Sequence, residues 1–140
     1  LVALLLCLWL WSIRSREVRD NRPRRPMPLT PDELGRIAFR IARSHDEFGW
    51  RDLFLNGSEA RDELGDDSAA YLAARSPEVL KQSLDQINAA IPADGVFAGV
   101  KPCGENRFGL LVRPIDGGNP ELIEIGSVVQ VGQVWRIFGP

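Results

Sequence analysis

The chain has 140 residues, a formal net charge of −2 and two cysteines. Its charge is divided unequally: residues 1–29 carry a net of +4, which leaves −6 on residues 30–140. An acidic domain repels nucleic acid, because binding to nucleic acid depends on neutralising phosphates. Cys7 and Cys103 form no CxxC or Cys/His cluster, so the sequence excludes a zinc site and favours no disulfide. We expect no metal and no cofactor.

Residues 1–13 are predicted to form a transmembrane or membrane-anchor helix. Leu1 to Trp11 is an unbroken apolar run, and Trp9 and Trp11 lie at its downstream end, where indoles favour the membrane interface. Such a helix rises about 20 Å, and a hydrocarbon core is about 30 Å thick. Further residues upstream, a thinned bilayer or neighbouring protein, or a secretion signal would each explain the difference. Positive charge follows the run instead of preceding it, which favours a retained anchor over a cleaved signal or a half-buried interfacial helix.

A basic, proline-rich juxtamembrane linker follows over residues 14–29. Guanidinium groups beside an apolar run are typical of a segment that meets a phosphate-rich surface. The predicted headgroup contacts are Arg14, Arg16, Arg19, Arg22, Arg24 and Arg25. Positive flanks stay on the cytoplasmic side, and we interpret the preference for Arg over Lys as codon bias in a GC-rich bacterium. The predicted location is therefore the bacterial inner membrane, single-pass, with the soluble domain in the cytoplasm and the periplasm as the alternative.

Residues 30–140 are predicted to form one soluble domain that begins with helices. A capping residue followed by proline starts two of them, at Thr30-Pro31 and at Ser76-Pro77. Apolar side chains recur at helical spacing after both, which predicts helices over 31–45 and 77–91.

Shorter helices are expected between these two, over 50–55, 58–64 and 69–74. In this prediction Asn56-Gly57 stops the first and Ser58 caps the second.

The second half of the domain is predicted to be a sheet. Apolar and aromatic runs alternate with turn residues, which is typical of an antiparallel meander. The expected strands are 96–101, 107–113, 122–130 and 133–138. Helices first and strands last predict an α+β fold, with helices packed on one face of a roughly four-stranded antiparallel sheet.

The order of these elements and the ending Val131-Gly132-Gln133-Val134-Trp135-Arg136-Ile137 resemble the nuclear-transport-factor-2-like (cystatin-like α+β) superfamily over residues 31–138. Members of that superfamily usually have a strand between their second and third helices, and the pattern here does not predict one. The resemblance implies a fold shared by pocket-type isomerases, ligand binders and membrane-anchored assembly components, and it does not choose among them.

Two groups of residues are candidates for a functional site. His45 is the only histidine, and with Asp46 beside it a general acid/base pair is conceivable, although a histidine at a helix end more commonly interacts with the helix dipole. The aromatic residues Phe48, Trp50 and Phe54 are candidates for docking a partner or lining a pocket, with a place in the core as the alternative.

The predicted function is a non-enzymatic, single-pass membrane-anchored accessory or structural subunit of a larger membrane protein complex, of a respiratory, photosynthetic, secretion or envelope type. Its expected partners are integral membrane proteins of that assembly and anionic lipid headgroups. The alternatives are a small-ligand-binding cone domain or an isomerase-like enzyme that uses His45.

Overall fold

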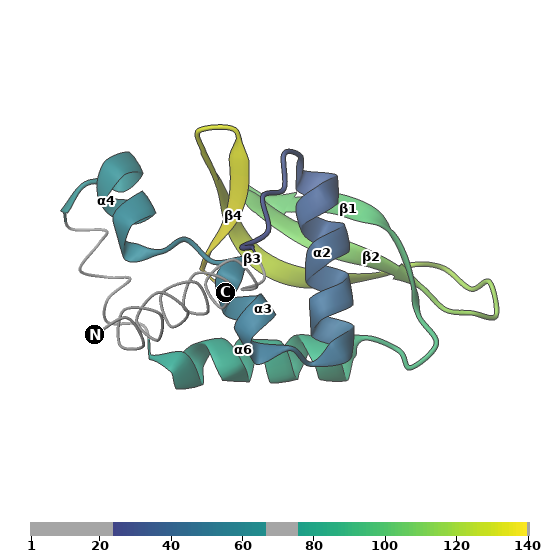
Figure 1. Cartoon of the computed structure of the whole chain (residues 1–140). Coiled ribbons are helices and arrows are strands. Elements are labelled where there is room, and N and C mark those ends of the chain that lie inside the picture. The colour runs from purple at the N-terminus through teal and green to yellow at the C-terminus, as the bar shows by residue number, and fades with distance from the viewer. Residues whose placement is uncertain (1–23, 67–75, 140) are drawn as a thin grey trace, which may run out of the picture.

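The computed structural model describes residues 24–66 and 76–139. Its elements are, in chain order, α2 (Pro31–Ser44), α3 (Glu47–Asp52), α4 (Gly57–Leu64), α6 (Pro77–Ala90), β1 (Val96–Gly104), β2 (Arg107–Arg113), β3 (Glu121–Val131) and β4 (Val134–Gly139). The strands pair antiparallel in the order β1-β2-β3-β4 (Figure 1). The predicted α+β class and the meander are therefore confirmed.

The predicted membrane anchor over residues 1–13 lies outside the described ranges, as does the expected helix over 69–74. Within the described ranges, no helix combines the length and the apolar character that crossing a bilayer requires.

The two long helices begin where the sequence predicts. The Thr30 hydroxyl accepts a hydrogen bond from the Glu33 backbone N–H at 3.1 Å, and the Ser76 hydroxyl accepts one from Val79 N–H at 3.4 Å. Each side chain satisfies a backbone donor that has no partner within its own helix, and a proline follows each cap. Local chemistry thus determines where α2 and α6 start.

The predicted helix over 50–55 is wrong in its bounds, because α3 ends at Asp52. Leu53 keeps helical backbone angles, and Phe54 then forms a parallel bridge with Ile137 of β4. Ile137 N–H donates to Leu53 O at 2.9 Å, and Leu55 N–H donates to Ile137 O at 2.9 Å. These hydrogen bonds join residues more than eighty positions apart, so the pattern of the local sequence contains no trace of them.

The predicted role of Asn56 is also corrected. Asn56 does not stop a helix but starts α4, because its side-chain oxygen accepts from Glu59 N–H at 2.8 Å while Glu59 Oε1 accepts from Asn56 N–H at 3.1 Å. This reciprocal pair is a capping box, and it makes Gly57 the first residue of the helix.

Strand β1 continues three residues beyond the predicted end at 101. The turn to β2 is reduced to Glu105 and Asn106, and Asn106 adopts a positive φ of 55°. Pro102 is tolerated because β1 is an edge strand and its register with β2 shifts beside this proline.

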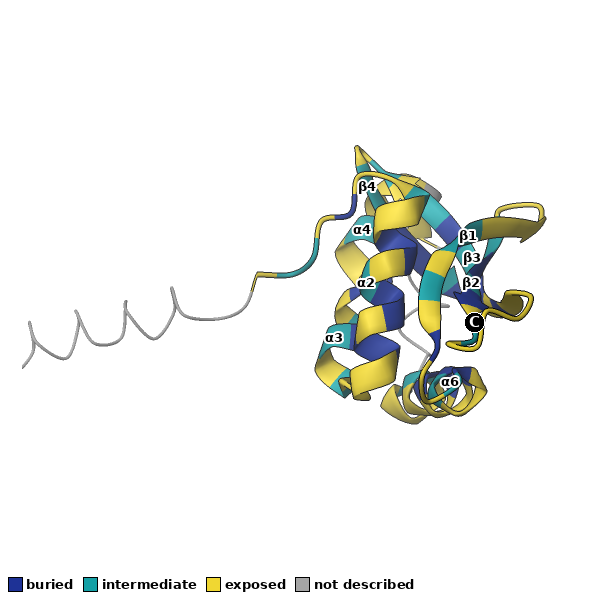
Figure 2. Cartoon of the chain, turned by 90° about the vertical axis from the view of Figure 1, so that its right-hand side faces the viewer, coloured by how far each residue is buried: buried dark blue, intermediate teal, exposed yellow. Residues whose placement is uncertain are grey.

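The main core lies between the sheet and the helices α2 and α6. Figure 2 shows the buried side of α2 turned toward the strands and its exposed side toward solvent. The largest fully buried side chains are Trp50, Leu34, Leu53, Leu84, Leu110, Ile137 and Val112. They come from α2, α3, α6, the strands and the residue that follows α3, so these parts of the chain share one core.

The prediction that the helices pack on one face of the sheet is wrong for α4. Its residue Ala60 packs with Leu55, Val129, Val131 and Phe138 in a separate small cluster. Successive residues of a strand face opposite sides, so these strand residues lie on the face opposite to that of their neighbours in the main core. Figure 1 accordingly shows β4 between α2 and α4.

Residues 24–29, which we call the strap, lie beside β4 just before α2 (Figure 1). Trp135 N–H donates to Pro28 O at 2.8 Å. The strap therefore hydrogen-bonds to the outer edge of β4 at Trp135, and the residues after α3 hydrogen-bond to the same edge at Ile137. An exposed edge strand is a template for unwanted pairing, and here the β4 edge is already occupied.

Candidate functional site

Three charged side chains meet where the strap, α4 and β4 come together, and we call them the clamp: Arg25, Glu59 and Arg136. Arg25 Nη1 donates to Glu59 Oε1 at 2.6 Å. Arg136 Nε donates to the other carboxylate oxygen, Oε2, at 3.4 Å. The capping box of α4 holds Glu59 in place for both contacts, because Asn56 fixes the position of the first helical turn.

The arginines of the clamp also bind backbone carbonyls. Arg25 Nε donates to Asp52 O at 2.9 Å, and its Nη2 donates to Phe54 O. Arg136 Nη1 donates to Pro26 O and, at 3.4 Å, to Asp52 O. Only 5% of the Arg136 side chain is exposed, so its guanidinium is almost completely removed from water. The clamp therefore ties the strap, the end of α3, α4 and β4 to one another.

The protonation states of the clamp follow from these contacts. Burial raises the pKa of Glu59, but the Asn56 backbone hydrogen bond and the positive charges of Arg25 and Arg136 outweigh burial, so the pKa lies below its ordinary value of 4.5. Burial and the like charge of Arg25 lower the pKa of Arg136, while Glu59 opposes that shift. A guanidinium starts from so high a pKa that it stays charged at neutral pH. The clamp thus contains two cations and one anion.

The structure describes two of the six arginines predicted to contact lipid headgroups, Arg24 and Arg25. Arg24 is exposed. All three nitrogens of the Arg25 guanidinium donate to Glu59 or to backbone carbonyls, so this side chain is part of the fold. Arg14, Arg16, Arg19 and Arg22, together with Trp9 and Trp11, lie outside the described residues.

His45 caps the end of α2 in the left-handed conformation, with φ 53°. Its Nε2 lies 2.5 Å from Oδ1 of Asp85 on α6, and both side chains are exposed. The neighbouring carboxylate that the sequence suggested as a partner, Asp46, instead caps α3 by accepting from Gly49 N–H at 3.0 Å. The imidazole therefore has a carboxylate partner, but one on another helix and at the surface.

The three aromatic candidates separate in the structure. Trp50 and Phe54 are buried in the main core, with ring centroids 5.6 Å apart, so the core alternative holds for both. Phe48 is 78% exposed, and the Arg51 guanidinium lies 5.8 Å from its ring centroid. Of the three, only Phe48 is available at the surface.

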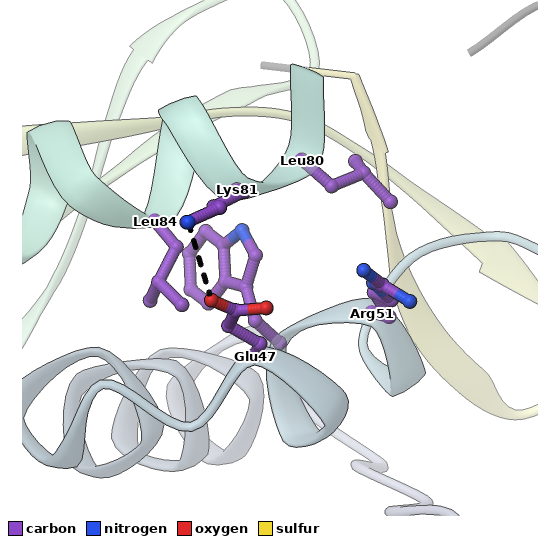
Figure 3. A pocket seen from close by; sticks show the side chains of 6 residues that line it. Glu47, Arg51, Leu80, Lys81 and Leu84 are labelled. Carbon is purple, nitrogen blue, oxygen red and sulfur yellow. Dashed lines mark ion pairs between the residues drawn. The ribbon is translucent and has the colours of Figure 1, made fainter. Parts of the chain in front are cut away.

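A recess between α3 and α6 has no free volume for a ligand. Figure 3 shows Glu47 of α3 facing Lys81 of α6, with Oε1 and Nζ 3.9 Å apart. Trp50 lines the floor, and its indole N–H donates to the Ser83 hydroxyl at 2.9 Å. This contact satisfies a buried donor and fixes α3 against α6.

A more open cleft of about 220 Å³ lies between α6 and the central strands. Its lining includes Ser83, Gln86 and Gly126, and one wall is an ion pair in which Arg107 Nε donates to Glu124 Oε1 at 2.5 Å. His45 lines neither this cleft nor the recess at Trp50. Across residues 24–66 and 76–139, no group of three or more His, Cys, Asp or Glu side chains is placed to hold a metal ion.

Neither Glu59 nor Arg136 was predicted from the sequence as a functional residue. The spacing Asn56-x-x-Glu59 is a capping-box signal that would have placed Glu59 at the start of a helix. It would not have indicated either arginine, because Arg25 and Arg136 reach Glu59 only through the tertiary fold. In comparisons with protein-family models, curated proteins and solved structures, nothing matched the chain.

Proposed function

We propose that the chain is a single-pass membrane-anchored accessory subunit of a larger membrane protein complex, in which residues 1–13 form the anchor and residues 30–140 the soluble domain. The single observation that supports this most is the clamp. The clamp attaches Arg25 to the domain, and Arg25 lies only twelve positions after the end of the apolar segment at Ile13.

The clamp shortens the connection between the proposed anchor and the domain. From Ile13 to Arg24 the backbone spans at most about 40 Å when fully extended. Without the clamp, the connection between the anchor and the domain would also include residues 25–30, up to the start of α2. A domain held within this distance of a bilayer is well placed to contact the membrane-facing parts of an integral partner.

The proposed partners are the integral membrane proteins of that complex, with anionic headgroups contacting Arg14, Arg16, Arg19, Arg22 and Arg24. The proposed orientation places the domain in the cytoplasm of a bacterial cell, because positive flanks are retained on that side. The resemblance to the nuclear-transport-factor-2-like superfamily is part of the same proposal, and it rests on the sequence pattern alone.

Membrane attachment is tested by fractionation of cells that express the full chain, followed by alkaline extraction. We expect the chain to stay in the membrane pellet. The double variant Leu5→Arg/Leu8→Arg should move to the soluble fraction, because each charge at a helix centre costs about 3 kcal/mol to insert. Leu5→Ala/Leu8→Ala is the matched control and should stay in the pellet. A wild-type chain that is extracted at alkaline pH would refute the anchor.

The subunit role is tested by site-specific photo-crosslinking from Phe48 in intact cells. A crosslink to one integral membrane protein that disappears in Leu5→Arg/Leu8→Arg supports the proposal. Purification of the chain from mild detergent as an isolated monomer, without such a crosslink, would contradict it. Protease added to spheroplasts tests the orientation, since a cytoplasmic domain is protected until the cells are lysed.

A small-ligand-binding domain is the second candidate, and the cleft at Ser83 and Gln86 is the observation that favours it. A metabolite that binds there should raise the melting temperature of the wild-type chain. Gln86→Trp, which places a large side chain in the cleft from an exposed position of α6, should abolish that shift.

A further inference from the structure

We infer that the strap edge of the domain lies directly on the surface of an anionic bilayer, with Met27 and Leu29 in the headgroup layer. This inference depends on the membrane anchoring proposed above and adds to it the side of the domain that faces the lipid.

The last residues of the strap place one side chain in the fold and two outside it. Pro28 is fully buried, whereas Met27 is 68% exposed and Leu29 is 55% exposed. These two apolar side chains flank the buried proline, and both are open to solvent. The strap edge therefore exposes two large apolar groups.

The fold prevents this edge from turning inward. Trp135 N–H holds Pro28 O at 2.8 Å, and Leu29 N–H donates to Glu33 Oε2 at 2.7 Å. Arg25 is held by the clamp on the preceding side. The backbone of the strap is thus fixed at both ends, and Met27 and Leu29 have no route into the core.

The strap directly follows the proposed anchor and its basic residues in the chain, which indicates lipid as the partner of the exposed Met27 and Leu29 side chains. Arg24 is exposed at the start of the strap and directly precedes Arg25, the last of the basic positions that follow the apolar run, whose side chain is held in the clamp. A cation next to exposed apolar side chains is the combination that interfacial segments use, because headgroup phosphates attract the charge and the acyl boundary accepts the apolar atoms. In Figure 2 the strap reaches the domain from the side where α2, α3 and α4 lie, away from β1.

The opposite edge of the sheet provides a matched comparison. Val96 on β1 is 54% exposed, almost the same fraction as Leu29. It lies three strand spacings from β4, which corresponds to about 14 Å. If exposure alone determined contact with lipid, Val96 and Leu29 would behave alike.

The test uses the full chain in vesicles of phosphatidylcholine and phosphatidylglycerol, in a Cys7→Ser/Cys103→Ser background. Met27→Cys, Leu29→Cys and Val96→Cys are made one at a time and labelled with an environment-sensitive fluorophore. Flotation of the vesicles reports anchoring, and quenching by spin-labelled lipid reports contact of the labelled position with the bilayer.

We expect all three labelled chains to float, and we expect lipid-borne quencher to reduce fluorescence at least threefold more at positions 27 and 29 than at position 96. Equal quenching at the three positions in floating vesicles would overturn the inference and leave the anchor intact. Failure of the chain to float would overturn the anchor, and this inference with it. Positions 27 and 29 that are shielded from iodide but not quenched by lipid would assign the edge to a contact between copies of the chain and would also overturn the inference.

Discussion

The Arg25 guanidinium donates to the Glu59 carboxylate at 2.6 Å across 34 positions of sequence. Arg25 belongs by sequence to the basic linker, and by structure to the domain. The same carboxylate also accepts from Arg136 of the last strand. One side chain of α4 therefore determines where the linker ends and the folded unit begins.

Glu59→Gln should destabilise the domain by about 3 kcal/mol, the lower end of the cost of breaking a buried ion pair. The variant leaves the guanidinium groups of Arg25 and Arg136 close together without an anion. Urea unfolding followed by tryptophan fluorescence measures the change in the free energy of unfolding. The control is Glu121→Gln at an exposed position of β3, which should change that free energy by less than about 0.5 kcal/mol.

The cost of Glu59→Gln should depend on pH in a defined direction. The pKa of Glu59 is lowered in the folded state, so its charge stabilises the fold above the unfolded-state pKa, and this contribution is lost as pH falls through the folded-state value. The difference between wild type and variant should therefore be complete at pH 7 and should shrink below about pH 4.5. A difference that grows on acidification would contradict the assigned charge state.

Ser83→Ala should cost about 1–3 kcal/mol, because it leaves the buried indole N–H of Trp50 without an acceptor. The hydroxyl lies 2.9 Å from that nitrogen and joins α6 to α3. Ser44→Ala at the exposed end of α2 is the matched control, since water can replace its contact with Ile41 O. Thermal unfolding of both variants measures the comparison, and equal stability would show that the Trp50 contact contributes nothing.

Gly35→Ala should destabilise the domain by about 1–3 kcal/mol, the usual cost of overpacking a core. A Cβ atom at this position of α2 would lie 2.2 Å from Cγ2 of Val100, so the Val100 side chain, the helix or β1 would have to shift. Gly57→Ala at the first position of α4 meets nothing within 4 Å and should be neutral or slightly stabilising. Urea unfolding separates the two, and a neutral Gly35→Ala would show that the core beside Gly35 accommodates a methyl group without loss of stability.

His45→Gly should change stability by less than about 1 kcal/mol, because relief of the left-handed conformation offsets loss of an exposed pair with Asp85. His45→Val also removes the imidazole, but a β-branched residue at φ 53° is strained, so it should cost about 1–2 kcal/mol more than glycine. The expected order of melting temperatures is Gly above Val. If both variants lost stability equally, the imidazole contact would matter more than the backbone.

The sequence alone was sufficient where the determining contacts are local. Thr30-Pro31 and Ser76-Pro77 start α2 and α6 through side chains that bind backbone three residues away. Strand β2 was predicted with its observed bounds, because turn residues and apolar runs alternate within a short stretch of chain. The fold class followed from the order of these elements.

The tertiary structure decided the features whose partners are distant in sequence. Residues 53–55 lie along β4 because Ile137 hydrogen-bonds to Leu53 and to Leu55, and Trp50 and Phe54 are buried because α6 and the sheet cover them. The clamp is of the same kind, since a charge pattern gives the sign of each side chain but not the side chain it will meet. Local sequence specifies hydrogen bonds that close within a few residues, whereas contacts between α4, β4 and the strap depend on how the whole sheet is assembled.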